Sequence, residues 1–321
     1  METNYIFERP LTPEASTEFL GKGAEYSNLY SGRLLAVIQH DEATDYQTGA
    51  HVQIDNPIDY AYKNYKKSLF SYARFDKFKD GSEVLIEDIH CDWKYNYILD
   101  TLGVLDYIAK YSETPISIIF PTNMDLKSIA ADHNYLNEFT IRIRRILMMH
   151  PHIKILIQNS NFVKSHDGEY FSLSGSTPGD SYVVAKYLRY ATESDRIGYC
   201  VDMSEYYAAE AFIKYIRPIT GTERFPILSF KEFLMNVYND DMLQLIIAGC
   251  NQGNEQTVND KGFGFSNNEE TKSKAEELAW LYNQFSLDKK CPIVIKGKTV
   301  DEENASAGIF SEILKNQGDL E

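Results

Sequence analysis

The sequence predicts an α/β fold in which eight parallel strands close into a (β/α)8 TIM barrel. Three observations lead to this prediction. The candidate strands are short, β-branched and nearly continuous in apolar residues, which is typical of strands buried on both faces. Most of them are followed by a helical pattern, as expected for a parallel sheet. Eight such strands in a chain of 321 residues fit one barrel, with a doubly wound open sheet as the alternative.

The strands are assigned where Val, Ile, Tyr and Phe dominate a short run between turn residues. In chain order they cover 49–54, a weaker run at 68–75, 83–89, 116–120, 153–158, 197–202, 243–249 and 292–296. Apolar residues at helical spacing predict the helices between them. These helices cover 95–111, 125–149, 180–192, 205–216, 269–286 and 302–316.

Residues 1–46 precede the first expected barrel strand, so we interpret them as an N-terminal extension of a barrel domain that covers 47–321. The strand-like run RLLAVIQ at 33–39 indicates that this extension is ordered. Two long polar, Gly-rich loops, 164–180 and 250–270, follow barrel strands. Loops of this length in a compact domain are usually functional or mobile.

The charge of the chain bears on its partners. Its 47 acidic and 32 basic residues give a formal net charge of −15. Nucleic-acid binding is disfavoured, because cationic contacts to phosphates supply most of that affinity. The one dense basic cluster, RIRR at 142–145, lies within a helical pattern and is interpreted as a solvated helix face. We therefore expect a protein partner within an assembly.

Several features point to a cytoplasmic protein. No apolar run reaches the roughly 18 residues of a membrane span, so no membrane association is expected. The N-terminus lacks the basic-then-apolar order of a signal peptide. Four cysteines lie far apart without a CxxC pair, which favours a reducing, intracellular environment: Cys91, Cys200, Cys250 and Cys291. The Asn-, Ile-, Lys- and Tyr-rich composition is typical of an AT-rich genome, and a virus or phage is one candidate source.

The segment RIGYCVDMSEYYAAEAFI at 196–213 raises the question of function. It predicts a buried strand that ends in Asp202, a turn that carries Glu205, and an amphipathic helix. In an α/β barrel the carboxyl ends of the strands form the catalytic rim. The same two residues also fit a structural role, since aspartate caps helices and acidic residues suit a first helical turn.

The order of several local strings resembles the endonuclease IV family of the xylose isomerase-like TIM barrels. The strings are TGAHVQIDNPIDYAYKN (48–64), IHCDWKYN (89–96), ILIQNS (155–160), the segment around Asp202, GFG (262–264) and CPIVIK (291–296). Together they cover roughly residues 48–316. That family cuts DNA beside abasic sites with three zinc ions held at the strand ends. The resemblance therefore implies a metal-dependent phosphodiesterase of DNA repair.

Most of the metal-ligand positions implied by this resemblance are altered. His90 and Asp202 keep ligand positions, while Glu205 replaces a histidine and still offers a ligand for a hard cation. The degenerate positions are Phe120 for a histidine, Gln158 for the bridging glutamate, Gln256–Val258 for an Asp-Arg-His segment, and Lys296 for the last glutamate; Ala248–Asn251 offers no histidine. Because a cluster of dications needs several anionic ligands, we expect the zinc cluster to be lost.

The sequence thus predicts a pseudoenzyme without a cofactor, which acts as a binding or structural component of a protein assembly. We expect Lys296 to contact Asp202 or Glu205, directly or through one water, because buried carboxylates need a cation. The alternative is an enzyme with a reduced site, in which His90, Asp202 and Glu205 hold one Zn²⁺ or another divalent ion. Such an enzyme would be a metal-dependent hydrolase of the AP-endonuclease type or a sugar isomerase.

Overall fold

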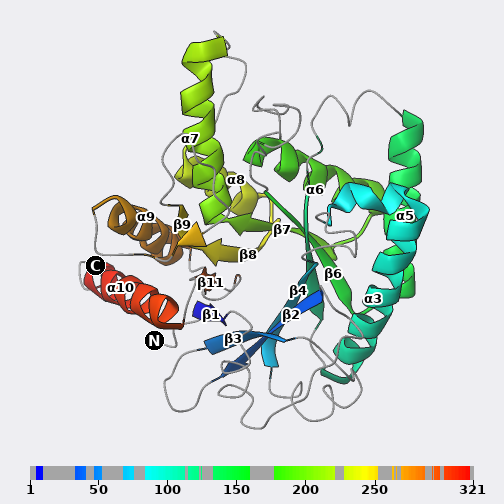
Figure 1. The fold of residues 1–321 in the computed structure, drawn as a ribbon, viewed down its shortest axis with the longest axis horizontal. Coiled ribbons are helices and arrows are strands. Elements are labelled where there is room, and N and C mark those ends of the chain that lie inside the picture. The colour runs from blue at the N-terminus through cyan, green and yellow to red at the C-terminus, as the bar shows by residue number, and fades with distance from the viewer. Residues whose placement is uncertain are drawn as a thin grey trace.

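In a computed structural model of the chain, a closed barrel forms the centre of the molecule (Figure 1). The structure describes residues 5–9, 33–40, 47–52, 68–75, 84–112, 115–122, 124, 133–159, 177–220, 228–251, 262–263, 265, 269–285, 291, 293–296 and 300–318. Within these ranges the wall has the order β1–β11–β8–β7–β6–β5–β4–β2–β3, and β3 pairs with β1 to close it.

The wall contains eight parallel strands and one strand of opposite direction. The strands are β1 (Tyr5–Arg9), β2 (Arg33–His40), β3 (Gln47–Val52), β4 (Ser68–Phe75), β5 (Ile116–Pro121), β6 (Ile153–Gln158), β7 (Ile197–Asp202), β8 (Leu243–Ala248) and β11 (Ile293–Lys296). β2 is antiparallel to both β3 and β4. The predicted α/β barrel of eight parallel strands is confirmed, with one antiparallel strand inserted into its wall. β9 (Cys250–Asn251) and β10 (Gly262–Phe263) form a separate antiparallel pair.

Helices surround a large part of this wall in Figure 1. They are the 3₁₀ helix η3 (Ile86–His90) and the α-helices α3 (Asp92–Ser112), α5 (His133–Met149), α6 (Pro178–Thr192), α7 (Met203–Thr220), α8 (Phe230–Asn239), α9 (Glu269–Phe285) and α10 (Val300–Gly318). α3 contacts β5 and β6, α6 contacts β6 and β7, and α10 contacts β1 and β11. In the part of the chain that the structure describes, no helix has the length and apolar character needed to cross a membrane.

Local sequence signals fix the ends of these helices. The hydroxyl of Thr177 accepts a hydrogen bond from the backbone N–H of Asp180 and caps α6, which begins at Pro178. The same helix ends at Glu193 in the left-handed region, with φ of 54°. Ser229 and Glu232 form a reciprocal capping box at the start of α8.

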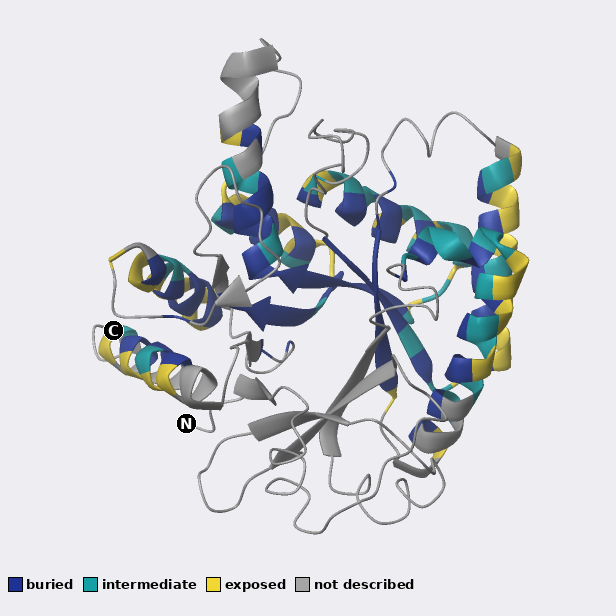
Figure 2. Ribbon diagram, viewed as in Figure 1, coloured by how far each residue is buried: buried dark blue, intermediate teal, exposed yellow. Residues whose placement is uncertain are grey.

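The hydrophobic core lies between the outer face of the wall and the helices. Alternate residues of β7, including Tyr199, point outward, and the ring of Tyr199 packs edge-on against Tyr182 of α6 and Phe233 of α8. Figure 2 shows β5 to β8 coloured as buried, while the outer side of α5 is exposed. The helices packed on the outer face thereby support the strands whose carboxyl ends carry the candidate site residues.

The structure differs from the sequence prediction at two strands. Residues 83–89 were expected to form a strand, but Ile86–His90 form the 3₁₀ helix η3. Ile86 and Ile89 are both buried and lie three residues apart, which places them on one side of a 3₁₀ helix. The remaining parallel strand is β1, which lies within the segment 1–46 together with β2. The wall therefore begins at Tyr5, and the boundary expected at residue 46 does not separate an extension from it.

Candidate functional site

Three expected site residues lie at one end of the barrel. Gln158, Asp202 and Lys296 are the last residues of β6, β7 and β11. These strands are parallel members of one wall, so all three residues lie at its carboxyl edge, as predicted. The side chain of Lys296 lies outside the described residues, and so does its expected contact with Asp202 or Glu205.

Gln158 presents a neutral, fully buried side chain at this edge. Ile155 and Ile157 belong to the outer core, and alternation along the strand turns Gln158 toward the barrel interior. Its Nε2 donates to the carbonyl of Asn159 at 3.3 Å. Its Oε1 meets no hydrogen-bond donor among the residues that the structure describes.

Asn159 joins the ends of β6 and β7. Its Nδ2 donates to the carbonyl oxygen of Asp202 at 2.8 Å. Its Oδ1 accepts from the backbone N–H of Asp202, also at 2.8 Å. Both residues are fully buried. Asn159 was not among the predicted site residues, although it is a polar residue directly after an apolar strand.

The carboxylate of Asp202 caps α7. Its Oδ1 accepts from the backbone N–H of Ser204 at 3.0 Å and from that of Glu205 at 3.2 Å. These are N–H groups that lack a partner within the first turn of a helix. Glu205 lies in this first turn and is half-buried. The geometry matches the capping role that the sequence allowed for Asp202.

His90 is the last residue of the 3₁₀ helix η3, whereas it had been expected to end a strand. Its ring stacks on Tyr135 and Phe139 of α5, with centroids 3.7 and 5.5 Å apart. Burial lowers the pKa of His90, although the nearby carboxylate of Glu138 acts in the opposite direction. Its Nε2 is buried and has no hydrogen-bond partner in the described part of the chain.

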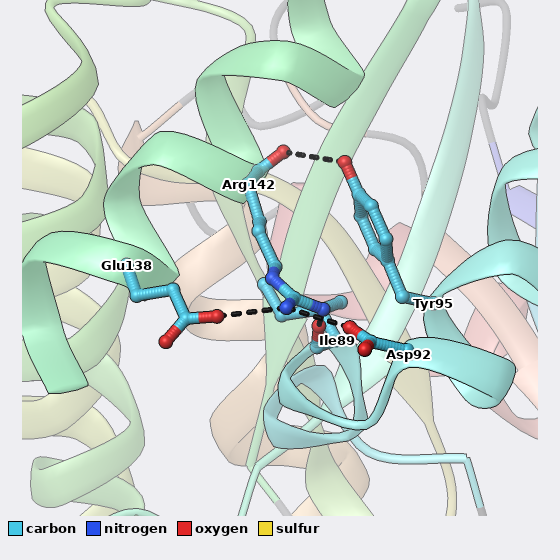
Figure 3. A network of polar contacts seen from close by, with 5 residues as sticks. All are labelled: Ile89, Asp92, Tyr95, Glu138 and Arg142. Carbon is cyan, nitrogen blue, oxygen red and sulfur yellow. Dashed lines mark hydrogen bonds and ion pairs between the residues drawn. The ribbon is translucent and has the colours of Figure 1, made fainter.

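Hydrogen bonds of Arg142 stabilise the contact between η3 and α5 (Figure 3). The guanidinium donates to the carbonyl of Ile89 at 2.7 Å, to Asp92 at 2.8 Å and to Glu138 at 2.7 Å. It also lies over the ring of Tyr95, 5.0 Å from the centroid. Arg142 of the RIRR cluster therefore links α5 to η3 and to the start of α3, whereas the sequence predicted that this residue lies on a solvated helix face.

Phe120 and Thr122 lie near the carboxyl end of β5, within the strand and directly after it. Phe120 is fully buried in the outer core, on the helix side of β5. Thr122 follows the end of β5, and its hydroxyl donates to the carboxylate of Glu87 and accepts from the N–H of Met124 at 3.1 Å. Thr122 and Glu87 were not expected to interact, because the sequence pattern around Glu87 predicts a strand.

The described residues do not provide the ligand set of a zinc cluster. Across the described ranges, no three His, Cys, Asp or Glu side chains gather in a way that could hold a metal ion. In particular, His90 is stacked on α5, whereas Asp202 is bonded to the start of α7. At the carboxyl edge, the carboxylate of Asp202 accepts hydrogen bonds from the backbone, and its main chain is bonded to the side-chain amide of Asn159.

No family model and no curated protein sequence matches the chain. Among solved structures, an endonuclease IV from Thermus thermophilus superimposes with a TM-score of 0.52. The alignment has 11% identity and covers 98% of this chain and 100% of that one. The chain has the TIM-barrel fold of endonuclease IV. At this identity the likeness establishes the fold alone.

Two sugar epimerases match the chain at lower similarity. A 3-keto-D-glucoside 4-epimerase from E. coli has a TM-score of 0.47 and 10% identity, covering 81% of this chain and 86% of that one. An L-ribulose 3-epimerase has a TM-score of 0.47 and 11% identity, and 84% of each chain is covered.

Proposed function

We propose that this chain is a non-catalytic barrel protein that serves as a binding or structural component of a protein assembly. The proposal rests on the hydrogen bonds that the Asp202 carboxylate accepts. Its carboxylate, at a ligand position implied by the resemblance, accepts two backbone hydrogen bonds that cap α7. A carboxylate used in this way has less capacity left for a metal ion.

The neighbouring strand end supports the same proposal. Gln158 stands where the resemblance implies a bridging glutamate, and its amide carries no charge to balance a dication. Asn159 further fixes the position of Asp202 through its main chain. The net charge of −15 disfavours DNA as the partner, because phosphate binding relies on cationic contacts.

The rival proposal is a metal-dependent phosphodiesterase or sugar isomerase with one ion at His90, Asp202 and Glu205. It requires His90 to leave its stack with Tyr135 and Phe139 and to approach α7. The two proposals differ in metal content and in activity on an abasic-site duplex.

The test uses the full chain purified without chelators. We expect no stoichiometric metal by elemental analysis. We also expect no nicking of an abasic-site duplex above background with added zinc, manganese or magnesium. Nicking that EDTA abolishes would overturn the proposal.

Asp202→Asn provides a matched variant for this test. Asparagine caps helices about as well as aspartate, so the fold is preserved while the charged ligand is removed. Metal content or nicking that is present in the wild type and lost in Asp202→Asn would favour the rival. A wild type and a variant that are equally metal-free and inactive support the non-catalytic proposal.

A further inference from the structure

We draw no further inference here: the strongest candidate, the buried polar side chains of Gln158 and Ser204 near the carboxyl edge of the barrel wall, whose Oε1 and Oγ meet no hydrogen-bond partner among the residues that the structure describes, belongs to the site already described, and nothing in the described part of the chain shows what would bind there.

Discussion

The side-chain amide of Asn159 forms two hydrogen bonds with the main chain of Asp202, one in each direction and both 2.8 Å long. A side chain thereby replaces the backbone pairing between β6 and β7 at the point where these strands end. It also sets the position from which Asp202 caps α7. Two strands and one helix at the barrel mouth thus depend on one buried amide.

Replacing Asn159 with Ala should lower the stability of the fold by about 3 kcal/mol, because the buried N–H and C=O of Asp202 each lose the hydrogen bond to this amide. Urea denaturation followed by circular dichroism measures this change. Asn236→Ala, at an exposed position of α8, is the control and should shift the midpoint little. Equal effects of the two substitutions would show that the paired bonds add nothing to stability.

Arg142 offers a second test of how the surface helices are held. Arg142→Met removes three charge-assisted hydrogen bonds and should cost about 2 kcal/mol. Arg142→Lys should recover less than half of this loss, since an ammonium cannot reproduce the planar fork. Chemical denaturation of the two variants beside the wild type measures both values. A lysine variant as stable as the wild type would contradict the role assigned to the fork.

His90 predicts how stability depends on pH. Burial lowers the pKa of its imidazole in the folded chain, so the unfolded chain binds a proton more readily as pH falls below about 6.5. The stability that depends on neutral His90 is present above this pH and is lost as pH falls toward the folded pKa. His150 has a pKa lowered by burial in the same way and adds to the trend.

His90→Phe keeps the aromatic stack with Tyr135 and removes the titrating group. Between neutral pH and the mildly acidic range, its urea midpoint should therefore fall less than that of the wild type. Paired denaturation curves at the two pH values measure the difference. If the urea midpoints of variant and wild type fall equally with pH, His90 does not contribute to the pH dependence of stability.

Lys296 tests the charge balance at the barrel mouth. We predict that its ammonium contacts Asp202 or Glu205, so Lys296→Met should cost on the order of 3 kcal/mol if the site is buried. Lys296→Glu restores the carboxylate implied by the resemblance, and we expect it to raise zinc affinity measured by titration calorimetry. An unchanged melting temperature for Lys296→Met would refute the contact.

The sequence predicted best where a strand is apolar throughout and is followed by a helix. Ile153–Gln158 and Ile197–Asp202 have the predicted bounds, because burial on both faces leaves a continuous apolar signal. The run at 83–89 was assigned wrongly, since a short apolar segment has no periodicity that distinguishes a strand from a 3₁₀ turn. The strand Tyr5–Arg9 was missed because it is five residues long and mixes apolar and charged side chains.

Clear strand patterns also decided which residues of the candidate site were predicted correctly. Gln158, Asp202 and Lys296 were placed correctly at strand ends, because each ends an assigned strand. The place of His90 depended on a strand that does not exist. Asn159 was missed because its importance lies in a contact with a residue 43 positions later, which no local pattern contains.

The pairing of β1 with β11 has a consequence for how the chain reaches its folded state. Tyr5 is in register with Ile293, so two segments from opposite ends of the sequence meet in one ladder. β1 gains its other neighbour, β3, from nearby sequence, but the ring stays open until β11 inserts between β1 and β8. Up to that moment the growing sheet has two unpaired edges, which invite pairing with other chains. Closing the wall therefore carries a large loop-closure entropy, and a chain whose wall is still open exposes strand edges that are prone to aggregate.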